Sequence, residues 1–196
     1  MRSAMLALVL LMVGSPGCMM VRDGNVKPPT QWPPHSNQQV KKSIALHVTE
    51  AGYQGGASQE IRSDAAGDVL AQAVKAYSES GLFSSVVTTG APADLKADII
   101  VGEGSNGLSW SGFISAFTLT MIPGVVSQDV IANTTYKDRQ QKVIGTIVKT
   151  EELGSWVQFF LLFAMPFVDG PSAIMDKAQY DLHRVTIEEA RGKGFF

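Results

Sequence analysis

The chain is short of cysteine, histidine and charge, and each shortage excludes a class of protein. One Cys among 196 residues excludes an intramolecular disulfide and a zinc site built on cysteines. The scattered His35, His47 and His183 make none of the close spacings that are typical of a His-based metal site. Only 17% of the residues are charged and the net charge is −2, so the basic stripe of a nucleic-acid-binding protein is not expected.

Patterns that are typical of catalytic sites are also weak here. The segment Gly102-Glu103-Gly104-Ser105-Asn106-Gly107 fits G-x-G-x-x-G, but Glu103 would place an anion against a phosphate, so we interpret it as a loop. The neighbouring acids Glu151-Glu152 and Glu188-Glu189 are interpreted as solvated faces, and no serine lies in a G-x-S-x-G elbow. We therefore predict a protein with no catalytic residues, no bound metal and no cofactor.

The N-terminal residues have the pattern of an export signal. Arg2 precedes an unbroken apolar run, Ala4–Val13, which is about half the roughly 20 residues that a membrane-spanning helix needs. The lone Cys18 follows the small residues Ser15-Pro16-Gly17 directly. This stretch resembles a bacterial lipobox, in which the Cys thiol is acylated and the Cys becomes the first residue of the mature chain.

The lipobox resemblance implies a lipid-anchored protein of the bacterial cell envelope. Gly17 and Cys18 match the pattern, whereas Ser15 and Pro16 depart from it, because an aliphatic residue is usual three positions before the Cys. An ordinary cleaved signal is the alternative. The sorting rule that the resemblance implies keeps lipoproteins with Asp after the Cys at the inner membrane. Because Met19 follows here, we expect palmitate on Cys18 and an outer-membrane location facing the periplasm.

Three regions follow from these patterns. Residues 1–17 are the signal peptide, and residues 18–42, with four prolines and no periodicity, are predicted to form a Pro-rich tether. Residues 43–196 are predicted to form a single α/β (α+β) domain, a mixed sheet of four to five strands with helices on one face. Strands are expected at 43–49, 86–87, 97–101, 129–136 and 142–150, with helices at 64–81 and 172–191, the first capped by Asp64 and ended by Gly81.

Part of this domain resembles a known group of envelope lipoproteins. The run Val69–Val87, VLAQAVKAYSESGLFSSVV, followed by Ala97–Val101, is similar to the TolB amino-terminal, CsgG and LpoB group. The resemblance covers residues 43–104, about a third of the chain. It rests on small and apolar positions and brings no catalytic signature.

Two uncharged blocks flank the hairpin that is expected at 129–150. No charged residue occurs between Glu103 and Asp129, or between Glu152 and Asp169. We expect apolar helical segments there, side by side, and three roles stay open: buried core, membrane contact or a self-association face. The candidate contact residues are Trp110, Phe113, Phe117, Trp156, Phe159, Phe160 and Phe163.

The sequence therefore predicts a lipid-anchored envelope protein without catalytic activity, which acts as a structural, assembly or protein-binding factor. The alternative is a subunit of a membrane-associated oligomer that uses the two apolar segments, and an enzyme is the least expected class. The predicted partners are the membrane, through the N-terminal lipid, and another envelope protein. Nucleic acid is not expected, and a homo-oligomer is compatible with the pattern.

Overall fold

The computed structural model describes residues 17–35, 40–53, 61–64, 67–88, 90–105, 121–158, 161 and 167–196. These residues form strands and helices in a mixed order along the chain. The elements are β1 (Gly17–Arg22), β2 (Ile44–Tyr53), β3 (Ile61–Asp64), α2 (Asp68–Glu79), β4 (Val86–Thr88), β5 (Leu95–Ser105), β6 (Gly124–Asp138), β7 (Val143–Gln158) and α4 (Pro171–Gly192).

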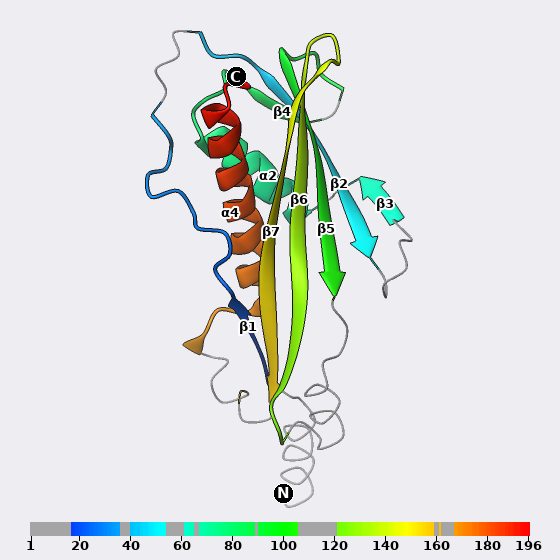
Figure 1. Ribbon diagram of the computed structural model, residues 1–196, viewed down its shortest axis with the longest axis vertical. Helices are drawn as coiled ribbons and strands as arrows, with labels where there is room; N and C mark the ends of the chain where they lie inside the picture. The colour runs from blue at the N-terminus through cyan, green and yellow to red at the C-terminus, as the bar shows by residue number, and fades with distance from the viewer. Residues whose placement is uncertain are drawn as a thin grey trace, which may run out of the picture.

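One mixed sheet organises the molecule, and α2 and α4 lie on one of its faces (Figure 1). The strand order is β1-β7-β6-β5-β2-β3, and the short β4 pairs with β2 off this path. β2 is parallel to β4 and β5, and the other pairs are antiparallel. The α+β domain with helices on one face is confirmed, but the described residues form seven strands where four to five were predicted.

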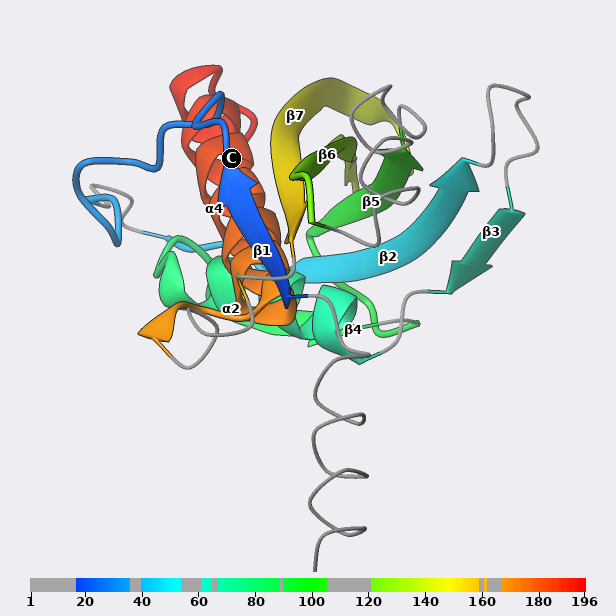
Figure 2. The ribbon, with the colours of Figure 1, turned by 90° about the horizontal axis from the view of Figure 1, so that it is seen from below.

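The core lies between the sheet and the two helices. Alternate residues of β2, such as Ile44, Leu46 and Val48, are buried on the helix-facing side. Leu182 and Ile187 of α4 are fully buried against that side. The view from below shows that the sheet is strongly curled, with α2 and α4 beside each other (Figure 2).

The hairpin of β6 and β7 is longer than its β-rich core predicts. Its register runs from Gly124 opposite Val157 to Lys137 opposite Val143. Residues 124–126 and 156–158 are therefore strand, which corrects the prediction of helical segments at these positions. The pairing of the two long strands provides hydrogen-bond partners for the backbone N–H and C=O groups there. These apolar residues therefore do not need a helix to satisfy their backbone groups.

The N-terminal segment also differs from the prediction. Gly17–Arg22 pairs with β7 as the edge of the sheet, and the side chain of Val26 is buried in the core. Trp32 packs against the core as well. The described part of residues 18–42 thus lies against the domain, where the sequence predicted a tether that extends away from it.

Two local predictions at the first helix have different outcomes. Asp64 is the last residue of β3, and Gly67 occupies the N-cap position of α2. Asp64 is therefore not the cap. At the other end, Gly81 adopts φ 64°, which confirms the left-handed residue predicted to end this helix.

Candidate functional site

Two of the sequence-predicted site residues belong to the described part of the chain, and they lie on the paired strands β1 and β7, on opposite faces of the sheet. Cys18 lies in β1, half-buried and with a free thiol, and its Cα is in register with Val157 of β7. Trp156, the neighbour of Val157, is 44% exposed. The other candidates lie outside the described residues: Trp110, Phe113, Phe117, Phe159, Phe160 and Phe163.

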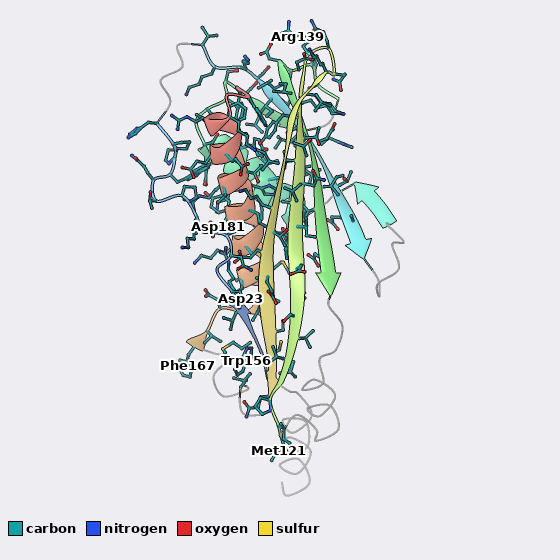
Figure 3. The ribbon with its side chains drawn as sticks, in the orientation of Figure 1. Asp23, Met121, Arg139, Trp156, Phe167 and Asp181 are labelled. Carbon is teal, nitrogen blue, oxygen red and sulfur yellow. The ribbon has the colours of Figure 1, made fainter. Side chains whose placement is uncertain are left out.

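Exposed apolar side chains gather where β1, β6 and β7 meet at one end of the molecule. Figure 3 shows Met121, Trp156 and Phe167 toward this end, and they are 57%, 44% and 87% exposed. Ile122 and Val168 beside them are exposed too. We call the five residues the apolar end: Met121, Ile122, Trp156, Phe167 and Val168. Of these five residues, the sequence pattern identified only Trp156, although the uncharged runs around the hairpin were a signal for the others.

Charge is absent from the strand segments that lead to the apolar end. Residues 17–21, 121–128 and 153–158 contain no Asp, Glu, Lys or Arg. Arg139 lies at the opposite end of the molecule (Figure 3), where it forms an ion pair with Asp94. A hollow of about 630 Å³ opens beside this pair. The strand segments at the apolar end are thus uncharged, although the exposed Asp169 directly follows Val168.

A buried ion cluster holds β1 to the rest of the domain. Arg22 Nε donates to Glu151 Oε1 at 2.9 Å, and Arg22 Nη1 donates to Asp181 Oδ2 at 2.6 Å. The amide of Val26 donates to Glu151 Oε2 at 2.6 Å, and Arg184 Nη1 donates to Asp181 Oδ1 at 3.0 Å. Burial opposes the charge of Arg22, but the hydrogen bonds to Asp181 and Glu151 outweigh it, so the pKa of Arg22 is raised.

This cluster corrects the interpretation of Glu151 as a solvated residue, because the Glu151 side chain is fully buried. Glu188 is exposed, and Glu189 is half-buried between Lys149 and Lys193. No sequence signal connects Arg22 to Glu151 and Asp181, which lie 129 and 159 positions away. Only the pairing of β1 with β7, and the packing of α4 beside them, brings the three together.

A second polar group lies on β2, β5 and β6. Asp98 forms ion pairs with two lysines: Lys96 Nζ lies 2.9 Å from its Oδ1 and Lys137 Nζ lies 2.6 Å from its Oδ2. His47 Nδ1 lies 3.4 Å from Asp98 Oδ1. Burial would raise the pKa of Asp98, but the hydrogen bonds from Lys137 and Lys96 lower it overall. The Asp98 carboxylate is thus held ionised between two ammonium groups, a state suited to an ion pair and unsuited to a general acid.

The glycine-rich segment is a strand in its described part. Residues 102–105 belong to β5 and pair with residues 128–131 of β6, which corrects the interpretation of these glycines as a loop. Burial, followed by the nearby charge of Glu50, raises the pKa of Glu103. An acidic side chain beside a second carboxylate is a poor neighbour for a phosphate.

His183 differs from the two polar groups in its environment, because its side chain is fully buried on α4. Burial lowers its pKa to about 4. In the described ranges, no group of three or more His, Cys, Asp or Glu side chains is arranged to hold a metal ion. The described helices include none that is both long and apolar enough to cross a bilayer.

Comparisons with known proteins find likeness only among solved structures. The sequence matches no family model and no curated protein. One solved structure is the PelC dodecamer from Paraburkholderia phytofirmans, whose sequence is 10% identical. The match covers 87% of this chain and 93% of that chain, with a TM-score of 0.34. A methionine variant of the same dodecamer has 11% identity, 87% and 95% coverage and TM-score 0.34.

A third solved structure is a neuraminyllactose-binding hemagglutinin homolog from Helicobacter pylori, with 9% identity, coverage of 81% of this chain and 90% of that chain, and TM-score 0.37. The predicted resemblance to the TolB amino-terminal, CsgG and LpoB group is wrong: no family model matches the sequence, and none of the solved structures named here is of that group. At such identities and TM-scores, the likenesses assign this chain neither a family nor a function.

Proposed function

We propose that this chain is a non-catalytic envelope protein that is anchored by a lipid on Cys18 and serves as a structural, assembly or protein-binding factor. The single observation that carries the proposal is the position of the only cysteine. It directly follows the predicted export signal in sequence, and in space it lies in the strand that leads to the apolar end. An acyl chain on this thiol would emerge beside side chains that are themselves apolar.

The use of the polar side chains supports a non-catalytic role. The charges of Arg22, Glu151 and Asp181 are bound to one another between β1, β7 and α4. Asp98 is engaged by Lys96 and Lys137. Groups that are held in such ion pairs have their donors and acceptors occupied by one another, and they stabilise a fold.

Metabolic labelling tests the anchor. We expect a bacterial host that expresses the full chain to incorporate labelled palmitate into the protein, and Cys18→Ser to lose the label completely. Met19→Ser is the matched control, because it changes the next residue of β1 and keeps the thiol. A wild-type chain without label, or a labelled Cys18→Ser variant, would show that the anchor is wrong.

A second candidate function is a subunit of a membrane-associated oligomer. The observation that favours it is on the sheet face opposite the helices, where Ile144 and Val148 of β7 are 37% and 56% exposed. Two β-branched side chains on one strand face are a suitable surface for another copy. Light scattering of the detergent-solubilised chain separates a monomer from an oligomer.

A further inference from the structure

We propose that the apolar end lies in the headgroup region of a phospholipid bilayer, with the long strands β6 and β7 rising away from the membrane. The inference deepens the proposed function and rests on it, because the lipid on Cys18 would bring this end to the bilayer. It assigns the membrane contact to side chains of the folded domain, in addition to the acyl chain.

The chemistry of the exposed side chains fits a lipid interface. Phe167, Met121 and Trp156 are exposed at this end, together with Ile122 and Val168. Tryptophan has an apolar ring with one N–H donor, and it is enriched where hydrocarbon meets headgroups. A patch of large apolar side chains on a domain surface marks a place that is covered in the working protein.

The distribution of charge favours a lipid bilayer as the surface that the apolar end contacts. Protein interfaces have an apolar centre and a polar, often charged rim. Here the strand ends that carry Met121, Ile122 and Trp156 are uncharged over residues 121–128 and 153–158, and the exposed Asp169 follows Val168 directly. The chain segments 106–120 and 159–166, which connect to this end, also have no charged residue in their sequence.

The absence of basic residues defines the kind of membrane contact. Proteins that dock by electrostatic attraction use clusters of Lys and Arg against anionic lipids. Arg22, the nearest basic residue of β1, is bound to Glu151 and Asp181 in the interior. The contact is therefore apolar, and it needs neither anionic lipid nor low salt.

The sheet limits how deep the apolar end can go. β1 is the last strand of the described sheet, so one edge of its backbone has no strand partner. Unpaired backbone N–H and C=O groups are tolerated among headgroups and water, and they are strongly disfavoured in hydrocarbon. The contact is shallow for this reason. Cys18, held in register with Val157, would place its acyl chain at about the depth of Trp156, from the opposite face of the sheet.

Tryptophan quenching by brominated lipid tests the contact on the full chain. The chain has three Trp residues, Trp32, Trp110 and Trp156. Trp32→Phe with Trp110→Phe leaves Trp156 as the only indole, and Trp110→Phe with Trp156→Phe leaves Trp32. In phosphatidylcholine vesicles brominated near the headgroup end of the acyl chain, we expect strong quenching of Trp156 and little quenching of Trp32, which packs on the domain core.

The second part of the quenching experiment introduces a charge at the apolar end. Phe167→Asp, in the protein with Trp156 alone, should reduce the quenching several-fold. Val40→Asp introduces the same charge at an exposed site outside the apolar end and should leave the quenching unchanged. Circular dichroism verifies that each variant is folded. Equal quenching of Trp156 and Trp32 would overturn the inference, and so would an unquenched Trp156 with the emission of a buried indole, which indicates a protein contact.

The result separates this inference from the anchor. A chain that takes up palmitate but leaves Trp156 unquenched would keep the anchor and reject the bilayer contact. A chain without palmitate whose Trp156 is quenched would reject the anchor and keep the contact. Quenching that is unchanged when phosphatidylglycerol is added, or when salt is raised, is expected for an apolar contact.

Discussion

The buried carboxylate of Glu151 is bound by two donors, one to each oxygen. Arg22 and the amide of Val26 donate to its two oxygens, and Arg22 also bonds to Asp181. A buried carboxylate without such partners would lose several kcal/mol of hydration free energy. A residue that looks like a surface acid in the sequence is thus a central element of the N-terminal attachment.

His183 makes the stability of the domain sensitive to acid. Its pKa is lowered to about 4 by burial, whereas an unfolded His titrates near 6.5. The unfolded state binds the proton more readily, so stability is complete above about pH 6.5 and falls as the pH decreases toward 4. The shift corresponds to about 3 kcal/mol of unfolding free energy.

Urea unfolding at pH 7.5 and pH 4.5 measures this effect. We expect His183→Leu, which keeps an apolar side chain of similar size in the core, to lose much less stability than the wild type between the two values. His35→Gln changes an exposed His and serves as the control. Identical pH dependence of the His183→Leu variant and the wild type would contradict the assignment.

Gly145 is required by a close approach of two chain segments. A Cβ at this position would lie 2.2 Å from Cζ of Phe195, whose ring packs 5.8 Å from Tyr136. We expect Gly145→Ala to displace Phe195 and cost about 1–2 kcal/mol of unfolding free energy, measured by urea denaturation. In Gly154→Ala, the nearest atom would be the carbonyl of Val21 at 4.0 Å, so no loss is expected in this control from the same strand.

At the scale of elements, β1 depends on side-chain anchoring as well as backbone pairing. It has one strand neighbour, β7, and an edge strand with a single neighbour is only marginally held by its ladder. The ion cluster adds a connection to α4 through Asp181. The attachment point proposed for the lipid is therefore fixed relative to the helices and the sheet.

Removing the Arg22 guanidinium should release this attachment. Arg22→Met leaves the buried Glu151 with only the Val26 amide, and we expect a loss of about 3 kcal/mol or more of unfolding free energy. Denaturation and limited proteolysis of the N-terminal segment measure it. Arg139→Met removes an exposed ion pair and should cost less than about 1 kcal/mol. Adding Glu151→Gln to Arg22→Met should recover part of the loss, and no recovery would argue against an orphaned charge as the cause.

At the scale of the whole molecule, the two ends of the long axis differ in their side chains. The same strands, β6 and β7, run from the charged turn near Arg139 to the apolar end near Met121 and Trp156 (Figure 3). A bilayer contact at the apolar end would hold the charged turn and the hollow beside Asp94 away from the membrane. That end is then the part of the domain that remains available to a water-soluble partner.

The sequence by itself determined the elements whose signals are local. Helical periodicity and a C-terminal glycine identified the helices that became α2 and α4, and alternation identified β2 and the centre of the hairpin. The only cysteine after an apolar run identified the candidate anchor. These signals depend on neighbouring residues alone, so no knowledge of the tertiary structure was needed to detect them.

Only the tertiary structure decided which distant residues meet. Cys18 lies opposite Val157, and Arg22 bonds to Glu151, because β1 pairs with β7, and the register of that pair is absent from any local pattern. Likewise, an apolar run has the same composition whether it continues a strand or forms a helix. At residues 124–126 and 156–158 the choice was made by the partner strand, whose backbone hydrogen bonds extend the hairpin beyond its β-rich centre.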